Sequence, residues 1–346
     1  MAFSIPSSAS PPIRRQSAYR GDDANQRAAV IDIGSNTIHL LVADCRPNAI
    51  WPIRDLRVRA RLGIAVADAG VLGTMRIRAA ASVVRTFAAE ARAWRAGEIM
   101  VLGTHAVRAA ADRGALADAV ETATGLRVHV LTPEQEATLC LAGASLGPLP
   151  AAPFLSVDIG GGSCDVAAVD ASGVRGITSV PVGSGVLAAR DLDGDPPSAA
   201  KVDRASERLA ALFEAALPGH GEFPEAVATG GAARRVGRQV TDRQGTAAGE
   251  ASQLLNVVAR LLHSPSTRWP HPVKPARAAT ARAGGAILRT IIIRWRIPQW
   301  RISPYGLREG ALALRARGQS LDAASAPPTR ARHPHVLEGL SGHHRA

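Results

Sequence analysis

The sequence predicts an α/β protein of two similar domains, each a mixed sheet flanked by helices, with an interdomain cleft. Two observations lead to this fold class. A short apolar run, a glycine-bearing loop and a second apolar run follow one another at 28–45 and again at 154–169. A break containing proline and glycine at 147–153 separates the two units. The 346 residues therefore divide into two lengths that can each bury a core.

The first domain is expected at 28–146, after an N-terminal tail over 1–27 that is rich in serine and proline and predicted to be disordered. Short apolar runs predict strands, and apolar residues at 3.6-residue spacing predict a helix. Thr132 is a good N-cap, with Pro133 and Gln135 at the positions that start a helix and close a capping box. Strands are expected at 28–33, 39–45, 99–102 and 126–131, and a helix at 75–94.

The second domain is expected at 147–324, and its last helix can pack back on the first domain. Its opening strand, loop and return strand repeat the order of the first domain. A segment with four prolines, 263–276, is expected to be a loop, and a basic tail over 325–346 to be disordered. Strands are expected at 154–159 and 165–169, and helices at 198–217, 247–262, 281–293 and 306–317.

Composition narrows the choice of partners. The net charge of +12 favours a polyanionic ligand, although an arginine-rich, lysine-poor chain can also reflect genome base composition. Aromatic residues make up only 3%, which argues against specific nucleic-acid binding by base stacking. No apolar run is long enough to predict a membrane span. Three widely spaced cysteines indicate reduced thiols, so a cytoplasmic protein is expected.

The two glycine-bearing loops predict phosphate binding. Consecutive backbone amides in such turns converge on an anion, and a phosphoryl group held between two loops would have its developing charge offset. Either loop alone would also fit an ordinary hairpin turn. Carboxylates beside the loops are the ligands Mg²⁺ prefers. The predicted phosphate-binding residues are Gly34, Ser35, Asn36, Thr37, Gly160, Gly161, Gly162 and Ser163, and the loops predict Asp32 and Asp158 as metal ligands.

Six segments in the expected order resemble the exopolyphosphatase and guanosine pentaphosphate phosphohydrolase (Ppx/GppA) family. This family belongs to the superfamily of sugar kinases, chaperones and actin, so the resemblance implies two ribonuclease-H-like domains of the actin-like ATPase type. The chain resembles the short, two-domain form. The matching segments are Val30–Leu41, Gly103–Ala109, Leu131–Ala137, Val157–Ser163, Ala228–Arg234 and Ile302–Gly310.

The resemblance implies roles for particular residues. Glu136 corresponds to the general base that activates the attacking water, with Glu134 as the close alternative. Both acids also suit the first turn of a helix because of its dipole. Arg108 corresponds to a substrate-binding arginine. Gly230 and Gly231 form either a further anion nest or a strand-to-helix turn, and the pair Arg308–Glu309 is either structural or part of the site.

The implied reaction is hydrolysis of the terminal phosphoanhydride bond of inorganic polyphosphate with Mg²⁺ or another divalent cation. The alternatives are the same chemistry on pppGpp, or a regulator that binds polyphosphate or nucleotide without catalysis. Two departures from the family pattern motivate the last option. Asp165 stands in place of a glutamate, where the resemblance still implies a metal ligand through water, and Ala279 stands in place of an acid. A homodimer is a further expectation from the resemblance.

Overall fold

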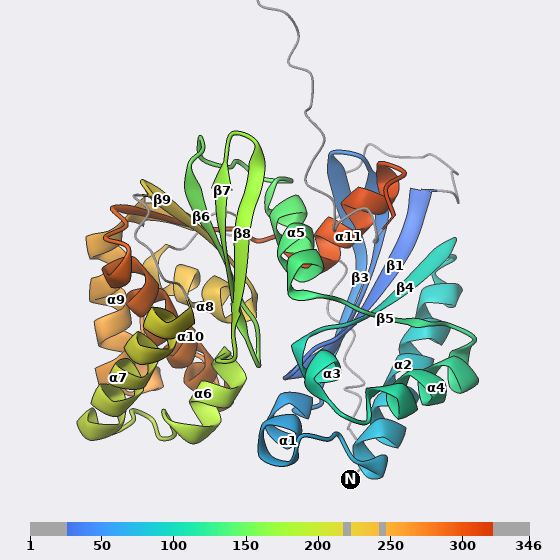
Figure 1. The fold of residues 1–346 in the computed structure, drawn as a ribbon, viewed down its shortest axis with the longest axis horizontal. Coiled ribbons are helices and arrows are strands. Elements are labelled where there is room, and N and C mark those ends of the chain that lie inside the picture. The colour runs from blue at the N-terminus through green and yellow to red at the C-terminus, as the bar shows by residue number, and fades with distance from the viewer. Residues whose placement is uncertain (1–25, 217–222, 242–246, 321–346) are drawn as a thin grey trace, which may run out of the picture.

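The computed structural model describes residues 26–216, 223–241 and 247–320, and its elements form two mixed sheets, each with helices beside it (Figure 1). The predicted fold class is confirmed. Both predicted tails fall almost entirely outside these residues, although the first strand already begins at Arg27. The predicted domain boundaries stay a prediction. In the described part of the chain, no helix combines the length and the apolar character required to cross a bilayer.

The first sheet has five strands in the order β3-β2-β1-β4-β5. Strands β1, β2 and β3 are antiparallel neighbours, whereas β4 and β5 continue the sheet in parallel from β1. One face packs on α2 through residues such as Ile31 and Phe87. The strands are Arg27–Ile33, Thr37–Arg46, Ala49–Arg59, Glu98–Gly103 and Val128–Val130, and the helices of this part are α1 (Leu62–Ala69), α2 (Thr74–Ala93), α3 (His105–Ala109) and α4 (Arg113–Thr124).

The second sheet has six strands in the order β10-β11-β9-β6-β7-β8, and its core is mainly aliphatic. Strands β6, β7 and β8 repeat the antiparallel arrangement of β1 to β3, and β9 is parallel to β6 as β4 is to β1. The strands are β6 (Phe154–Ile159), β7 (Cys164–Asp170), β8 (Gly173–Val180), β9 (Glu225–Thr229), β10 (Ala247–Glu250) and β11 (Gln299–Ile302). The helices are α6 (Ser184–Arg190), α7 (Ala199–Ala216), α8 (Gly231–Val240), α9 (Ala251–His263) and α10 (Pro275–Arg294).

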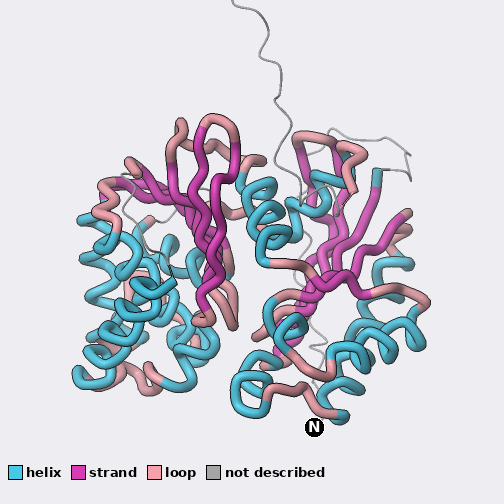
Figure 2. Tube along the Cα trace, viewed as in Figure 1, coloured by secondary structure: helices cyan, strands magenta, loops and turns pink. Residues whose placement is uncertain are grey.

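Helices α5 (Pro133–Ala144) and α11 (Leu307–Ala316) lie between the two sheets (Figures 1 and 2). They pack on the second face of the first sheet, where Leu139 and Leu312 join Val30 and Leu41 in one cluster. Glycines make the contact between the helices very close. A Cβ at Gly310 would lie 1.8 Å from the Leu139 carbonyl oxygen, so only glycine fits there. This pair of helices connects the two sheets on one side. On another side, Arg190 of α6 pairs with Asp68 of α1.

Several predicted elements need correction. Residues 247–250 are not helical but form β10, because their backbone pairs with β11 and the helix begins only at Ala251. Helix α10 begins at Pro275, inside the predicted loop, since proline is well tolerated at the first helical position. The predicted strand 126–131 shortens to β5, and the last residue of the predicted helix 198–217 lies outside the described residues. The capping box at Thr132 and Gln135 is confirmed.

Candidate active site

The two loops predicted to bind phosphate have the same backbone turn. The Gly34 amide donates to the Thr37 carbonyl at 3.1 Å, and the Gly160 amide donates to the Ser163 carbonyl at 3.0 Å. Each turn joins antiparallel strands, β1 to β2 and β6 to β7. The repeated order of strand and loop in the sequence therefore produces one local structure twice.

Backbone amides of neighbouring segments donate hydrogen bonds to carbonyl groups of both loops. The Ser35 carbonyl accepts from the Gly63 amide at 2.7 Å, and the Gly161 carbonyl accepts from the Gly185 amide at 2.9 Å. By contrast, the amides of Asn36 and Gly162 donate to no backbone acceptor among the described residues. The loops thus keep N–H groups available for an anion, as a phosphate nest requires.

The loops lie against each other. A Cβ at Gly162 would lie only 2.5 Å from Ser35 Oγ, and a Cβ at Gly161 would lie 3.0 Å from the Asn36 amide nitrogen. Gly183, at the start of α6, approaches the second loop even more closely, with its Cβ position 2.3 Å from the Gly162 nitrogen. Small residues at these positions are therefore required for the two halves of the protein to meet.

Three carboxylates gather beside the loops. Oxygens of Glu136, Asp158 and Asp165 lie within 4.8 Å of one another, a spacing that could hold a metal ion. Asp158 and Asp165 are directly paired across β6 and β7, and Glu136 comes from α5. Both carboxylate oxygens of Asp165 are buried, and although the Ser163 and Ser179 side chains lie near enough to lower its pKa, neither oxygen has a partner with hydrogen-bond geometry in the described structure. Such a group favours either a bound cation or a proton, because a bare buried charge is costly.

Burial and mutual repulsion control the ionisation of this group. Burial raises the pKa of Glu136, and the nearby charge of Asp165 raises it further. Burial is also the main reason why the pKa values of Asp158 and Asp165 are raised. The three acids repel one another when ionised and therefore resist ionisation. A divalent cation bound among them would stabilise their ionised, carboxylate form.

Asp32, the third predicted metal ligand, lies next to this group but is not one of the three. Burial raises its pKa to about 7, the Arg308 guanidinium opposes that rise, and Asp158 adds to it. Its Oδ1 atom is buried without a hydrogen-bond partner among the described residues. The structure therefore brings Asp158 and Asp165 together with Glu136, and leaves Asp32 as a neighbouring acid on the first loop.

Arg108 contacts the predicted base rather than an open surface. Its Nη1 donates to Glu136 Oε2 at 2.8 Å and to the Leu131 carbonyl at 2.7 Å. Glu136 is only 4% exposed, whereas Glu134, the alternative base, is exposed. Of the two glutamates, the structure brings Glu136 to the loops. The helix start that places it there is fixed by the capping box at Thr132.

The glycine-rich segment after β9 approaches the second loop. Gly230 has a φ of 96°, and its Cβ would lie 2.4 Å from the Ile159 carbonyl oxygen, so both the backbone angle and the space favour glycine. Gly231 begins α8. Just before them, the Thr229 hydroxyl donates to Asp158 Oδ1. The segment therefore forms a strand-to-helix turn, and its Thr229 also orients the Asp158 carboxylate of the site.

Sequence reasoning missed one neighbour of the second loop and left the roles of two arginines undefined. A Cβ at Gly162 would lie 2.7 Å from a ring carbon of His105, which no motif had marked as a neighbour of the second loop. Arg234 is a half-buried cation whose Nη1 donates to the Pro304 carbonyl at 3.0 Å. Arg308 pairs with Asp55 at 3.5 Å and lies 3.9 Å from Glu309. The sequence had left the role of the pair Arg308–Glu309 open, and the charge of Arg308 lowers the pKa of Asp32 on the first loop.

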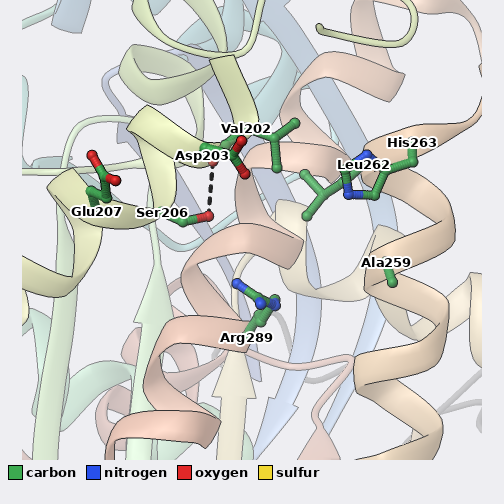
Figure 3. A pocket seen from close by; sticks show the side chains of 8 residues that line it. All are labelled: Val202, Asp203, Ser206, Glu207, Ala259, Leu262, His263 and Arg289. Carbon is green, nitrogen blue, oxygen red and sulfur yellow. Dashed lines mark hydrogen bonds between the residues drawn. The ribbon is translucent and has the colours of Figure 1, made fainter. Parts of the chain in front are cut away.

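A separate pocket of about 340 Å³ lies among α7, α9 and α10 (Figure 3). Asp203, Glu207, His263 and Arg289 contribute polar groups to it, and Figure 3 shows Ser206 bonded back to the main chain of its own helix. It contains none of the residues predicted from the loops. The candidate active site is therefore the set of three carboxylates beside the loops, Glu136, Asp158 and Asp165.

Comparisons with known proteins show which family and fold this chain resembles. The exopolyphosphatase 1 of Mycobacterium leprae is 28% identical over 88% of this chain and 94% of its own. That of Mycobacterium tuberculosis is 32% identical, but the match covers 51% of this chain and 52% of that protein. Among solved structures, the Ppx/GppA family member of Aquifex aeolicus has a TM-score of 0.72 at 24% identity, covering 85% of this chain and 98% of that one. An exopolyphosphatase from Cytophaga hutchinsonii has a TM-score of 0.71 at 19% identity, covering 86% and 99%.

The two solved structures share the fold of this protein. The mycobacterial exopolyphosphatases are similar to it in sequence. A model of the Ppx/GppA phosphatase family matches residues 41–316, which include the second loop, the Glu136 segment and both Gly230 and Arg308. The match covers well over half of the chain. This protein therefore belongs to the Ppx/GppA phosphatase family.

Proposed function

We propose that this protein is an exopolyphosphatase that releases orthophosphate from the end of inorganic polyphosphate. The observation that supports this most directly is the buried carboxylate of Glu136 beside two phosphate-type loops. The names of the mycobacterial relatives support polyphosphate as the substrate. The net charge of +12 agrees with a polyanionic substrate.

In the proposed reaction, the terminal phosphoryl group lies between the two loops. Free amides of the loops, among them those of Asn36 and Gly162, donate to its oxygens. Water attacks the terminal phosphorus, its proton passes to the Glu136 carboxylate, and the bond from phosphorus to the bridging oxygen breaks. The shortened chain leaves with the electrons of that bond. Burial raises the pKa of Glu136 to about 8, and a base whose pKa lies near the working pH is well matched to this proton transfer.

Arg108 has two uses in this scheme. Its bond to Oε2 fixes the orientation of the Glu136 carboxylate, so that Oε1 is the oxygen that receives the proton. The remaining guanidinium N–H groups can donate to a phosphoryl oxygen, because an arginine offers five donors in a planar fork. This retains the predicted contact of Arg108 with substrate and adds a role in orienting the base.

The residues fit a divalent cation. Asp158 and Asp165 would hold Mg²⁺, with Glu136 within reach of the same position and Asp32 as a neighbouring acid. The unpartnered oxygens of Asp165 are the structural reason to expect an ion there. A bound Mg²⁺ would offset the negative charge of the transferred phosphoryl group.

The test measures orthophosphate release from polyphosphate and from pppGpp, with and without Mg²⁺. Glu136→Gln should lower kcat by roughly 10²- to 10⁴-fold, the usual contribution of a general base. Glu134→Gln is the matched control, since Glu134 is exposed two residues earlier on the same helix. Faster release from pppGpp would overturn the assignment to polyphosphate. Binding of polyphosphate without release would favour a regulator, and equal effects of both substitutions would refute Glu136 as the base.

A further inference from the structure

The pocket in Figure 3 lies outside the candidate active site, and the proposed reaction uses none of its side chains. Helices α7 and α9 both pack on α10, and a space of about 340 Å³ lies among the three. Small-molecule sites typically have volumes of about 300 to 1,000 Å³. Val202 and Leu262 are buried and, with Ala259, give the pocket an apolar wall. The pocket therefore has the size and the surface for a small ligand with an apolar part.

Charged groups of both signs line the rest of this pocket. Asp203 and Glu207 are four residues apart on α7, so they are neighbours on one face of that helix. Arg289 comes from α10, and Figure 3 shows its guanidinium group pointing into the space between the other two helices. The arginine is half-buried, whereas both acids are exposed. The pocket thus holds one cation at its base and two anions at its rim.

These opposite charges do not pair with one another. Within the described ranges, Arg289 makes no ion pair or hydrogen bond, and neither acid of the pocket lies within 4.0 Å of a cationic nitrogen. Other arginines of the same two helices are paired, Arg208 with Asp191 at 2.7 Å and Arg294 with Glu214 at 2.9 Å. The charges that line the pocket therefore remain available to a ligand.

We propose that this pocket binds a small zwitterion of the α-amino acid class with an apolar side chain. The ligand's carboxylate accepts hydrogen bonds from Arg289, because the planar guanidinium fork matches the two oxygens of a carboxylate. Its ammonium group lies beside Asp203 or Glu207, and its side chain lies against Leu262. A simple anion would be repelled by the two acids, and a simple cation would be repelled by the arginine. A ligand that carries both charges satisfies both sides of the pocket.

The test measures binding of L-leucine to the full-length protein by isothermal titration calorimetry. Three analogues each lack one feature of this probe. Isocaproate has no ammonium group, isoamylamine has no carboxylate, and glycine has no apolar side chain. L-leucine should bind with a Kd of about 1 mM or lower, and each analogue should bind about tenfold more weakly, as expected for the loss of one favourable contact.

Substitutions identify the side chains that bind the probe. Arg289→Gln and Asp203→Asn should each weaken L-leucine binding about tenfold. Arg204→Gln is the matched control, because Arg204 is exposed on α7 next to Asp203 but does not line the pocket. This control should bind L-leucine as the wild type does. Urea unfolding of each variant verifies that it is folded, and the exposed Asp203 provides a test even if Arg289→Gln is unstable.

Binding at this pocket is independent of the phosphate loops. Glu136→Gln should therefore bind L-leucine normally, and a wild type that releases no phosphate would defeat the proposed function without affecting these measurements. The inference is overturned if the wild type shows no saturable binding of L-leucine up to about 10 mM. Equal affinity for L-leucine and any of the three analogues, or the same loss of affinity in Arg204→Gln, would also overturn it.

Discussion

The contact between α5 and α11 gives a prediction that can be worked out from distances. In Gly310→Ala, the new Cβ would lie 1.8 Å from the Leu139 carbonyl oxygen and 2.8 Å from the Gly143 nitrogen. An ordinary close approach of carbon to a carbonyl oxygen is about 3.3 Å, so the helices must separate by roughly 1.5 Å. The obstacle is backbone, which cannot rotate away as a side chain would. Overpacking of this kind costs about 1–3 kcal/mol, and we expect the upper end.

The same displacement should reach the site. Leu139 lies one turn after Glu136 on α5, so moving this helix also moves the carboxylate away from Asp158 and Asp165. Urea unfolding of Gly310→Ala should show a stability loss of about 3 kcal/mol, and kcat should fall with it. Gly114→Ala is the control, because no atom lies within 4 Å of its Cβ position. If Gly310→Ala is as stable and as active as this control, the helices are not in the close contact described here.

Three further predictions concern other parts of the protein. Arg282→Met should lower stability in urea by about 3 kcal/mol, because Arg282 is fully buried and its loss removes the ion pair with Asp195 and leaves the Leu261 carbonyl without its donor, while Asp195 keeps its bonds from Ser266; a loss below about 1 kcal/mol would contradict this. Thr132→Ala should cost about 1 kcal/mol through loss of the capping box of α5, and an unchanged urea midpoint would count against that role. Without Mg²⁺, the melting temperature should fall from about pH 5 to pH 8, because acids with raised pKa, such as Asp32 at about 7, bind more protons in the folded state than in the unfolded chain. Added Mg²⁺ should raise the melting temperature most at the higher pH, and an equal increase at both pH values would argue against a cation at these acids.

Local features of the site were predictable from neighbouring residues. The turn at Gly34 and the turn at Gly160 each need only a glycine between two apolar strands, and both form as predicted. The start of α5 depends on Thr132, Pro133 and Gln135, which lie within one turn of each other. Such features follow from short-range hydrogen bonds and allowed backbone angles, so they can be recognised in one stretch of chain.

Edge strands and helix starts were predicted less well. Strand β3 contains Pro52 and many charged residues, and it was missed because its pairing with β2 determines its structure more than its composition does. Strand β10 was assigned to a helix because Ala247 to Glu250 have no strong strand preference of their own. Their conformation is fixed by β11, which lies about fifty residues further along the chain.

The sequence by itself thus determined the fold class, the two loops and the glutamate segment, because each of these depends on residues close together in the chain. Only the tertiary structure decided how they combine. It placed Glu136 of α5 beside Asp158 and Asp165, paired it with Arg108, and left Asp32 outside that group. The physical reason is that burial, repulsion between carboxylates and ion pairing act between groups that are distant in sequence. Their strength is set by the packing of two sheets and two helices, which no single segment encodes.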